Sequence, residues 1–352
     1  MTKKVLVTGG AGFIGANFVH YWHNAYPDST IVVLDALTYA GNKANLGGVL
    51  NSDNIHFEHG NICNAQRVYS LLESFNIDTI VHFAAESHVD RSIDSAQPFI
   101  ETNVMGTLTL LEAAKKYWFD NDIEEHRFHH VSTDEVYGSL SCTAPAFAET
   151  NQYQPNSPYS ASKAASDHLV RAFHHTYGLK VTTSNCSNNY GPFHYPEKLI
   201  PLIILNILHN KPLPIYGDGL QIRDWLHVTD HCRAIDIILK DGRVGEVYNV
   251  GGNNEWRNID IVNAICDLIN QEFASNSAWA VDYPQALAAI NGSCEQLITY
   301  VDDRPGHDTR YAINAEKIQQ LNFFPTYQFE KGIQETINWY LNNPSWWAPL
   351  YR

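Results

Sequence analysis

Short apolar runs alternate with longer amphipathic segments through the first half of the chain. The runs are rich in β-branched and aromatic residues: KVLVTGG, TIVVLDA, IHFEHG, DTIVHFAA, RFHHVST and LKVTTSNC. Most of the segments between them have helical spacing, for example IGANFVHYWHNAY, AQRVYSLLESF and TNVMGTLTLLEAAKKYW. Buried strands that alternate with amphipathic helices are typical of a parallel sheet covered by helices on both faces. The pattern therefore predicts an α/β fold with a doubly wound parallel sheet.

The rhythm of the pattern changes after about Asn185. Prolines follow at positions 192, 196, 201, 212 and 214, and a strand-like run, EVYNVGG, lies near Tyr248. We expect residues 1–185 to form the main domain and residues 186–352 to form a smaller C-terminal α/β lobe. Late strands near residues 222–250 should rejoin the main sheet.

The composition is that of an acidic globular protein. Of the 352 residues, 44% are hydrophobic and 17% are charged, and 23 Lys and Arg stand against 38 Asp and Glu, for a formal net charge of −15. This balance argues against nonspecific binding to nucleic acid or to an anionic membrane, although one basic pocket could still hold an anionic ligand.

Neither the start of the chain nor its most apolar stretch indicates export or membrane insertion. Only VLV is apolar between MTKK and TGG, and the longest apolar run, LIPLIILNIL from Leu199, is too short to span a bilayer. We therefore expect a cytoplasmic protein. The six cysteines are scattered without a C-x-x-C pair, which fits reduced thiols, and the 17 histidines show no metal-ligand spacing, so we expect no metal.

A glycine pattern follows the first apolar run directly. In VLVTGGAGFIG, Gly9, Gly12 and Gly15 lie between a predicted strand and a predicted helix, where a dinucleotide pyrophosphate needs bare backbone and a helix N-terminus. The next strand ends in Asp35, where a carboxylate can accept hydrogen bonds from the adenosine ribose and repel a 2′-phosphate. The alternative is an aspartate that only caps its strand. The combination predicts that residues 1–185 form a Rossmann-type domain that binds NAD rather than NADP.

The stretch YSASK gives a candidate catalytic pair. Tyr159 and Lys163 are four residues apart and so share one helix face, which could also be an ordinary exposed face. A tyrosine, with a pKa near ~10, becomes a base at neutral pH only when cations stabilise its phenolate. Downstream of the glycine pattern, this pair resembles the catalytic pair of the short-chain dehydrogenase/reductase superfamily. In that superfamily a Ser or Thr at the end of the fifth strand bonds the reacting oxygen, and Thr133 stands there.

Further motifs extend the resemblance through most of the chain: VTGGAGFIGANF, LDALTYAGN, HFAAESHVDRSID, NVMGTLTLLEAA, STDEVYG, NCSNNYGPFHYPEKLIP, LPIYGDGLQIRDWLHV and DRPGHDTRYAI. They resemble the extended branch of the superfamily, which acts on nucleotide sugars, and within it the dTDP-glucose 4,6-dehydratase family. The resemblance implies a hydro-lyase with tightly bound NAD that converts dTDP-glucose to dTDP-4-keto-6-deoxyglucose and water. It also implies a role in deoxysugar biosynthesis such as that of dTDP-rhamnose, and a homodimer joined through two helices.

The two acids of STDEVYG have a use in that reaction. Oxidation at C4 of the sugar needs only Tyr159, Thr133 and Lys163, whereas elimination of water across C5 and C6 also needs a base and an acid. The resemblance implies that Glu135 is the base and Asp134 the acid. Adjacent carboxyls in a partly buried site cannot both ionise freely, which suits these roles. Both can reach one sugar only if the strand has ended before them, since neighbouring strand residues point to opposite faces.

The resemblance also assigns binding residues by matching motifs. The cofactor contacts are Gly9, Gly12, Phe13, Ile14, Gly15, Asp35, Thr38, Asn61, Ile62, Ala84, Ala85, Ser87, His88, Thr102, Tyr159 and Lys163. The sugar-nucleotide contacts are Ser87, Thr133, Asn188, Lys198, Leu199, Pro214, Ile215, Tyr216, Arg223, Asn258, Asp303, Arg304 and His307. Among them, Arg223 and Arg304 are the natural diphosphate clamps, because a guanidinium can bond phosphate oxygens bidentately.

The pattern of the family is broken at one position near the adenine. The chain reads GNI where GDI is expected, so Asn61 replaces an acid. An amide still accepts and donates hydrogen bonds, so we expect the affinity for NAD to be altered rather than lost.

Two other functions share part of this evidence. Another nucleotide-sugar enzyme of the same branch, such as a different dehydratase or a 4-epimerase, would keep the glycine pattern and the Tyr159 and Lys163 pair, but a 4-epimerase has no need of Asp134 and Glu135. A catalytically silent nucleotide-sugar sensor would have no need of the catalytic set at all. The nucleobase of the substrate does not follow from these residues.

Overall fold

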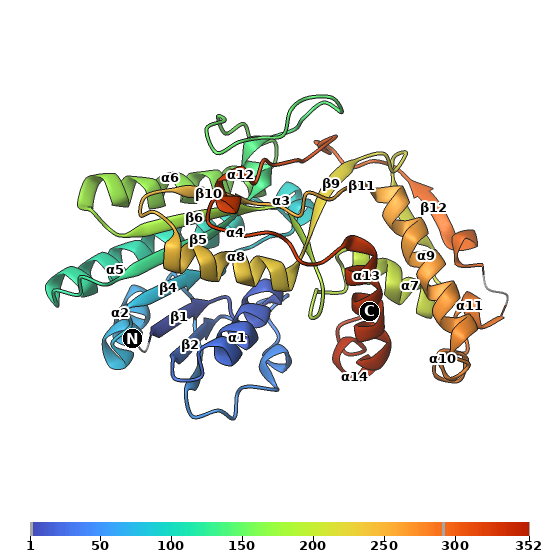
Figure 1. The fold of residues 1–352 in the computed structure, drawn as a ribbon, viewed down its shortest axis with the longest axis horizontal. Helices are drawn as coiled ribbons and strands as arrows, with labels where there is room; N and C mark the ends of the chain where they lie inside the picture. The colour runs from blue at the N-terminus through green and yellow to red at the C-terminus, as the bar shows by residue number, and fades with distance from the viewer. Residues whose placement is uncertain (1–2, 291–292, 352) are drawn as a thin grey trace.

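The structure, a computed structural model, describes residues 3–290 and 293–351. Its largest element is a sheet of seven parallel strands in the order β10-β6-β5-β4-β1-β2-β3 (Figure 1). The strands are β1 (Lys4–Thr8), β2 (Thr30–Asp35), β3 (Ile55–His59), β4 (Thr79–His82), β5 (Arg127–Thr133), β6 (Val181–Cys186) and β10 (Val247–Val250). The strand order reverses at β1, and ligands of such sheets bind beyond the carboxyl ends of the strands at this point. The predicted doubly wound sheet is confirmed.

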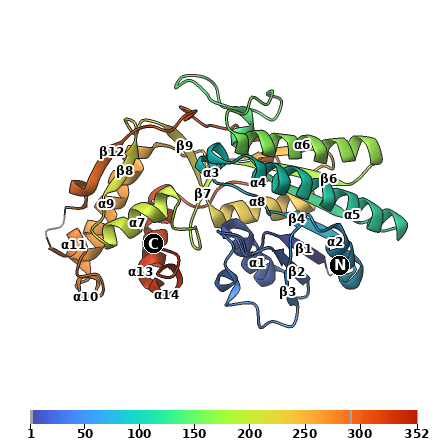
Figure 2. The same ribbon diagram turned by 180° about the vertical axis from the view of Figure 1, so that it is seen from behind.

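Helices cover both faces of the sheet because successive strand side chains point to opposite sides. Val5 and Val7 pack with α1 (Phe13–Ala25) and α8 (Val228–Asp241). Leu6, between them, packs on the opposite face with α2 (Ala65–Phe75), α5 (Thr107–Asp120) and α6 (Pro158–Tyr177). Figures 1 and 2 show α5 and α6 side by side on that face. Each strand therefore serves two separate cores.

The C-terminal lobe has its own apolar core, formed by α7 (Leu199–Leu208), α9 (Asn258–Ser275), α13 (Phe329–Asn342) and α14 (Pro344–Trp347). Helices α10 (Ala278–Asp282) and α11 (Leu287–Ile290) lie at its far end (Figure 2). Two small sheets accompany it, one with β7 (Asn188–Tyr190), β9 (Ile222–His227) and β11 (Glu255–Arg257), the other with β8 (Leu213–Tyr216) and β12 (Ile298–Val301).

The late strands differ in part from the expectation that they rejoin the main sheet. Strand β10 does pair with β6 at the sheet edge, with Val247 opposite Thr183. Strand β9 instead lies between β7 and β11, parallel to the first and antiparallel to the second. Apolar alternation in a sequence identifies a strand but not its partner, and here the long-range contacts of the lobe decide the pairing. The domain boundary at residue 185 stays a prediction.

Short elements link these layers: η1 (Lys43–Leu46), α3 (Val89–Asp94), α4 (Gln97–Phe99), η3 (Asp134–Tyr137), η4 (Cys294–Leu297) and α12 (Glu316–Gln319). A π-helical stretch, η2 (Ile100–Gly106), leads directly into α5. Helix α3 matters most for the site, because it follows β4 and lies between the sheet and the C-terminal lobe (Figure 2). Across residues 3–290 and 293–351, no helix combines the length and apolar character needed to cross a bilayer.

Candidate active site

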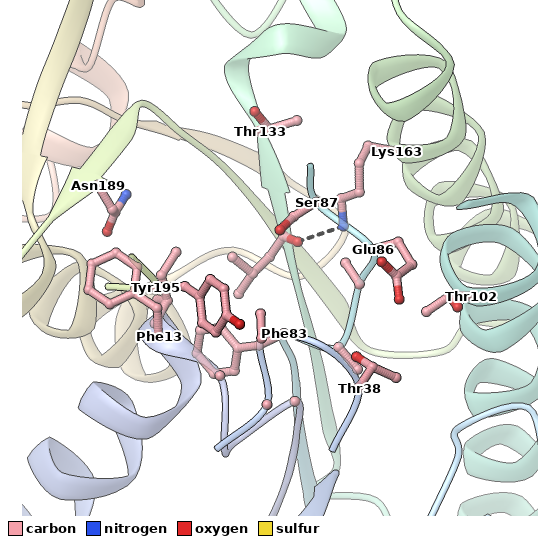
Figure 3. A pocket seen from close by; sticks show the side chains of 18 of the residues that line it. Phe13, Thr38, Phe83, Glu86, Ser87, Thr102, Thr133, Lys163, Asn189 and Tyr195 are labelled. Carbon is pink, nitrogen blue, oxygen red and sulfur yellow. Dashed lines mark hydrogen bonds between the residues drawn. The ribbon is translucent and has the colours of Figure 1, made fainter. Parts of the chain in front are cut away.

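A cavity of about 370 Å³ lies at the carboxyl ends of the central strands. Gly9 follows β1, Asp35 ends β2, Ala84 follows β4 and Thr133 ends β5, and all four line the cavity. Figure 3 shows Phe13 and Tyr195 on one side of it, with Lys163 and Thr102 on the other. The cavity therefore occupies the crevice that the strand order predicts.

The glycine turn gives this cavity a bare backbone floor. Gly9 has φ +69°, and a Cβ on it would lie 2.6 Å from the Ala84 nitrogen. A Cβ on Gly15 would lie 2.3 Å from the Gly9 carbonyl oxygen, so Gly15 lets α1 pack on the turn without itself lining the cavity. Gly12 is the N-cap of α1, which leaves the first amides of that helix available to an anion. A side chain at Gly9 or Gly15 would collide with backbone and force this turn to change shape.

Asp35 is fixed at the end of β2 by two backbone amides. Its Oδ2 accepts from Ala11 N at 2.9 Å and its Oδ1 from Leu37 N at 2.8 Å. Burial raises the pKa of Asp35, and these two hydrogen bonds oppose that rise. A carboxylate has about four acceptor positions, so two remain for a ribose diol. Together with the bare glycine turn, this anchored carboxylate fits NAD.

Most of the predicted cofactor residues meet in this cavity. Those that line it are Gly9, Gly12, Phe13, Ile14, Asp35, Thr38, Asn61, Ile62, Ala84, Ala85, Ser87, Thr102, Tyr159 and Lys163. His88 does not line it, because it is the N-cap of α3 and lies 3.6 Å from Glu197. The amide oxygen of Asn61 accepts from Cys63 N at 2.8 Å, which leaves its NH₂ group for a ligand. The position that breaks the family pattern thus presents a donor where a carboxylate would present only acceptors.

The strand does end before the two adjacent acids, as their joint action on one sugar requires. Strand β5 ends at Thr133, and the chain turns at once into the 3₁₀ helix η3, which begins at Asp134. Asp134 and Glu135 therefore escape the alternation of a strand and both line the cavity. Thr133 caps the turn, because its hydroxyl accepts from Glu135 N at 3.3 Å and donates to Asp134 Oδ1 at 3.4 Å.

The two acids have different surroundings. Burial raises the pKa of Asp134 well above its usual value, and Glu135 raises it further. Burial also raises the pKa of Glu135, but the cations of Arg223, Arg304 and Lys198 oppose that rise. Asp134 is only 2% exposed, and its Oδ2 has no hydrogen-bond partner among the described residues. The arrangement favours a protonated Asp134 beside an ionised Glu135.

Tyr159 and Lys163 lie on the first two turns of α6. A capping box of Ser157 and Ser160 fixes the start of this helix, and Pro158 occupies its first position. Lys163 donates to the Val131 carbonyl at 2.9 Å. Burial raises the pKa of Tyr159 well above its usual value, Glu135 raises it further, and the Thr133 hydroxyl lowers it. A phenolate at Tyr159 therefore requires nearby positive charge.

The predicted sugar-nucleotide residues divide into two groups. Ser87, Thr133, Asn188, Lys198 and Leu199 line the cavity. The predicted residues from Pro214 onward do not line it: Pro214, Ile215, Tyr216, Arg223, Asn258, Asp303, Arg304 and His307. The structure nevertheless brings the two arginines near the acids, since both lower the pKa of Glu135.

Three polar side chains of the second set already have partners within the protein. Arg304 binds Asp90 Oδ1 at 2.8 Å, and His307 Nδ1 lies 2.6 Å from Asp303 Oδ1. Arg223 donates to the carbonyls of Ile222 and Asp308 at 2.8 and 2.9 Å and lies over the Tyr311 ring. Arg304 Nε is buried without a hydrogen-bond partner in the described part of the chain. A phosphate oxygen would supply the missing acceptor.

Several cavity residues were absent from the sequence prediction. They are Tyr39, Phe83, Cys186, Asn189, His194 and Tyr195, among others. His194 stacks on Phe13 with ring centroids 4.2 Å apart, and Tyr195 meets Tyr39 edge-on at 5.8 Å. The aromatic and proline-rich run GPFHYPEK was visible as a signal, but nothing in it indicated that it would lie over the glycine turn.

Comparisons with known proteins agree with this geometry. A family model described as GDP-mannose 4,6 dehydratase matches residues 6–336. The chain is 51% identical to the dTDP-glucose 4,6-dehydratase of Salmonella typhimurium, over 97% of this chain and 94% of that one. It is 55% identical to that of Xanthomonas campestris pv. campestris, again over 97% and 94%.

A solved structure is also similar to this chain along its whole length. The dTDP-glucose 4,6-dehydratase of Bacillus anthracis, solved in complex with NAD, has a TM-score of 0.86 at 46% identity and covers 99% of this chain and 100% of its own. The fold and the site define an NAD-dependent enzyme of the extended short-chain dehydrogenase/reductase class. The chain belongs to the dTDP-glucose 4,6-dehydratase family.

Proposed function

We propose that this chain converts dTDP-glucose to dTDP-4-keto-6-deoxyglucose and water. The observation that carries the proposal is the pair Asp134 and Glu135, which leaves the end of β5 and lines the same cavity as Tyr159. Oxidation alone requires no second acid and base, whereas dehydration requires both. The similar proteins of Salmonella typhimurium, Xanthomonas campestris pv. campestris and Bacillus anthracis carry the name of that activity.

The oxidation is assigned to residues of β5 and α6. Tyr159 takes the proton of the C4 hydroxyl, and Thr133 holds the same oxygen by a hydrogen bond. Lys163, buried one helical turn from Tyr159, stabilises the phenolate. NAD, held by the glycine turn and Asp35, supplies the hydride chemistry by accepting hydride from C4 and returning it to C6.

The elimination is assigned to the two acids. Glu135 takes the C5 proton, and Asp134 gives its proton to the C6 hydroxyl, which leaves as water. After the hydride reaches C6, Glu135 returns its proton to C5. The surroundings support this division. Burial and then Glu135 raise the pKa of Asp134, and only Arg223 among the cations opposes this, whereas Arg223, Arg304 and Lys198 all oppose the rise that burial causes in the pKa of Glu135.

Binding of the sugar nucleotide is assigned to the remaining predicted residues. Asn188, Lys198 and Leu199 lie at the cavity, and Arg223 and Arg304 lie within electrostatic reach of Glu135. We assign the diphosphate to these two arginines, and Pro214, Ile215, Tyr216, Asn258, Asp303 and His307 to the nucleoside side of the same ligand.

The test is to offer glucose linked to dTDP, UDP, CDP and GDP and to follow the 4-keto-6-deoxy product. We expect the dTDP sugar to give the highest kcat/KM without any added oxidant. Bound NADH should form and disappear in each turnover. Free NADH that accumulates in step with product would contradict the cycle, and absence of product with all four sugars would contradict the function.

The same assay separates the alternatives. A 4-epimerase would return the C4 epimer and would incorporate no solvent deuterium at C5, whereas a dehydratase exchanges the C5 hydrogen. A silent sensor would bind the sugar nucleotide without reducing bound NAD. The acids at the end of β5 favour the dehydratase over both.

We also propose a cytoplasmic homodimer joined through α5 and α6. These helices lie side by side on one face, and Ile100 and Met105 just before α5 are 46% and 50% exposed. Exposed apolar side chains of this size favour burial against a second copy. Light scattering after size exclusion should give twice the chain mass, and Met105→Glu should lower it to the mass of one chain. An unchanged dimer in that variant would place the contact elsewhere.

A further inference from the structure

A group of buried polar side chains lies behind the catalytic pair, outside the cavity. His130 of β5 is 0% exposed and Asp167 of α6 is 6% exposed, and neither lines the cavity. His130 Nε2 lies 3.1 Å from Asp167 Oδ1 and 3.3 Å from Ser166 Oγ. The mechanism above uses none of these three residues, although Asp167 lies one helical turn after Lys163. Burial of an ionised carboxylate costs free energy unless a partner compensates it, so we asked what Asp167 does at this position.

The hydrogen bonds settle how the histidine is protonated. Ser166 donates its hydroxyl proton to the Lys163 carbonyl at 2.8 Å, so towards His130 it can only accept. The proton of His130 is therefore on Nε2, from which it is shared between Ser166 Oγ and Asp167 Oδ1. Burial lowers the pKa of His130 well below its usual value, so the ring is neutral. A neutral ring that donates to Asp167 holds a negative carboxylate in place.

Lys163 needs such a carboxylate. Lys163 is only 4% exposed, and its ammonium group donates a hydrogen bond to the uncharged Val131 carbonyl. Burial lowers the pKa of Lys163, and the opposing influence comes first from Asp167. Residues four apart on a helix lie on one face, so Asp167 faces the same strand as Lys163. A buried ammonium without an anion would lose its proton, and a neutral lysine cannot stabilise a phenolate.

We propose that Asp167 is a positioning residue that keeps Lys163 in its ammonium form, and that His130 fixes the carboxylate in place for this purpose. The inference rests on the proposed function for the roles of Tyr159 and Lys163. Asp167 itself touches neither substrate nor cofactor in this arrangement. It acts by supplying one negative charge to the protein side of the lysine.

The other titratable groups around the pair do not supply that charge. Towards Lys163 these are His82 of β4, His130 of β5 and Cys186 of β6; burial lowers the pKa of both histidines and raises that of the thiol to about 12. Towards Asp167 they are His168 on α6, Tyr137 on η3 and Tyr153, and burial raises the pKa of both phenols. Burial raises the pKa of Asp167 itself to about 6, and Lys163 opposes the rise. Above that pH, Asp167 is the anion of this cluster.

Loss of the Asp167 charge should change the pH dependence of the first hydride transfer. The first hydride transfer requires Tyr159 without its proton and Lys163 with one, so its rate falls at alkaline pH as the lysine deprotonates. Asp167→Asn keeps the size of the side chain and its acceptor for His130 but removes the charge. The alkaline limb should then shift to lower pH by about one to three units, since this is the usual influence of one nearby opposite charge. The onset of Tyr159 ionisation should shift the opposite way, to higher pH.

Two measurements test this. One is the rate of bound NADH formation in a single turnover between pH 6 and about 11, a range chosen from the ordinary pKa values of lysine and tyrosine. The other is tyrosinate absorbance of the substrate-free protein, taken as the difference between each form and the same form with Tyr159→Phe. Asp167→Ser provides a second neutral variant, and Asp167→Glu restores the charge. Both neutral variants should shift the limbs alike, and Asp167→Glu should return them towards the wild-type positions.

The matched control is Asp236→Asn. Asp236 is also a buried helical acid, 4% exposed, but it accepts from Tyr21 and Tyr26 at 2.8 Å on the opposite face of the sheet. This variant should change neither the pH at which the rate of bound NADH formation falls nor the pH at which Tyr159 ionises. A uniform loss of rate at every pH in Asp167→Asn or Asp167→Ser, with unmoved limbs, would reduce Asp167 to a structural role and overturn the inference. Equal shifts in Asp236→Asn would overturn it as well.

Failure of the inference is distinguishable from failure of the proposed function. If the function is wrong, wild-type protein forms no 4-keto-6-deoxy product from any sugar nucleotide, and the tyrosinate titration still tests Asp167. If only the inference is wrong, the wild type forms product and the neutral variants keep its alkaline limb.

Discussion

The two walls of the active-site cleft, one facing the cofactor and one facing the substrate, differ in the groups that form them. The cofactor wall is built on the backbone of the glycine turn, where a Cβ on Gly9 would lie 2.6 Å from the Ala84 nitrogen and a Cβ on Gly12 would lie 3.2 Å from the Gly9 carbonyl oxygen. The substrate wall extends beyond the cavity lining and includes polar and charged side chains, of which Arg304 and His307 are held by Asp90 and Asp303. The first wall takes its shape from packing before any ligand arrives. The second takes its shape from ion pairs that a charged ligand must exchange.

This difference predicts how each wall responds to substitution. A single added methyl group on the cofactor wall meets rigid backbone, so the response should be abrupt. Loss of one charge on the substrate wall removes one of several interactions, so the response should be graded. In the proposed mechanism the chemistry takes place where the walls meet, at Tyr159 and the two acids, so we expect the largest effects there.

Substitutions at that junction should separate the two half-reactions. Tyr159→Phe removes the base for the C4 hydroxyl, so even bound NADH should form slowly. Glu135→Gln and Asp134→Asn should still reduce bound NAD but form little product. A positioned acid or base commonly contributes on the order of 10²–10⁴ in rate. The measurement is NADH absorbance in a single turnover, read beside deuterium exchange at C5.

The exchange reaction distinguishes the two amide variants from each other. Glu135→Gln should lose exchange at C5, whereas Asp134→Asn should retain it because the C5 proton can leave without departure of water. Wild-type turnover in both variants would show that neither acid takes part in the elimination.

On the cofactor wall, Gly15→Ala should weaken NAD binding about ten- to hundredfold. The new Cβ would meet the Gly9 carbonyl oxygen at 2.3 Å, and overpacking of this kind costs about 1–3 kcal/mol. Titration calorimetry with NAD measures the change. Gly48→Ala is the control, because a Cβ there meets only His20 Cε1 at an ordinary 3.5 Å. If Gly15→Ala bound NAD as tightly as the wild type, the glycine turn could adjust to the added methyl group without loss of the cofactor site.

On the substrate wall, Arg304→Gln should raise KM for the sugar nucleotide about tenfold and leave NAD affinity unchanged. A hydrogen bond to a charged group contributes about 1.5–3 kcal/mol, and the loss of the Asp90 pair offsets part of it. Steady-state kinetics and NAD calorimetry on the same preparation check both halves. If NAD affinity fell as far as KM rose, the two walls would not be independent.

The smallest effect should be a shift in pH dependence. Burial raises the pKa of Glu135 and Lys198 opposes that rise, so Lys198→Gln should raise it further. Glu135 acts as the ionised base, so C5 exchange is present above its pKa and lost as pH falls through it. The acid limb of the exchange rate should therefore move to higher pH, by less than about one unit for a single partly exposed cation. A limb that stays in place or moves to lower pH would remove Lys198 from the surroundings of Glu135.

The sequence predicted the cofactor wall better than the substrate wall, and the reason is physical. Gly9, Asp35 and Thr133 each lie at the end of a parallel strand, and such ends meet at one edge of a sheet whatever the rest of the fold does. The end of β5 before Asp134 was likewise predictable, as the condition under which both acids could act.

The parts that escaped prediction depend on contacts between distant segments. His194 stacks on Phe13 across the cavity, and Asp90 reaches Arg304 in the other lobe. Strand β9 pairs outside the main sheet for a similar reason. Neither hydrophobic period nor residue type specifies such partners, because each is set by how the two lobes dock.

Helix α3 is held from two sides by separate ion pairs. Arg91 binds Glu197 at 3.0 Å, next to the segment that covers the cofactor cavity, whereas Asp90 binds Arg304 at 2.8 Å. In the proposed binding mode, a diphosphate would compete with Asp90 for Arg304 and would leave the contact between Arg91 and Glu197 in place. Exchange of sugar nucleotide and exchange of cofactor then become separate kinetic events. We expect the residence time of NAD to exceed that of the sugar by many turnovers, which suits a hydride that never leaves the enzyme.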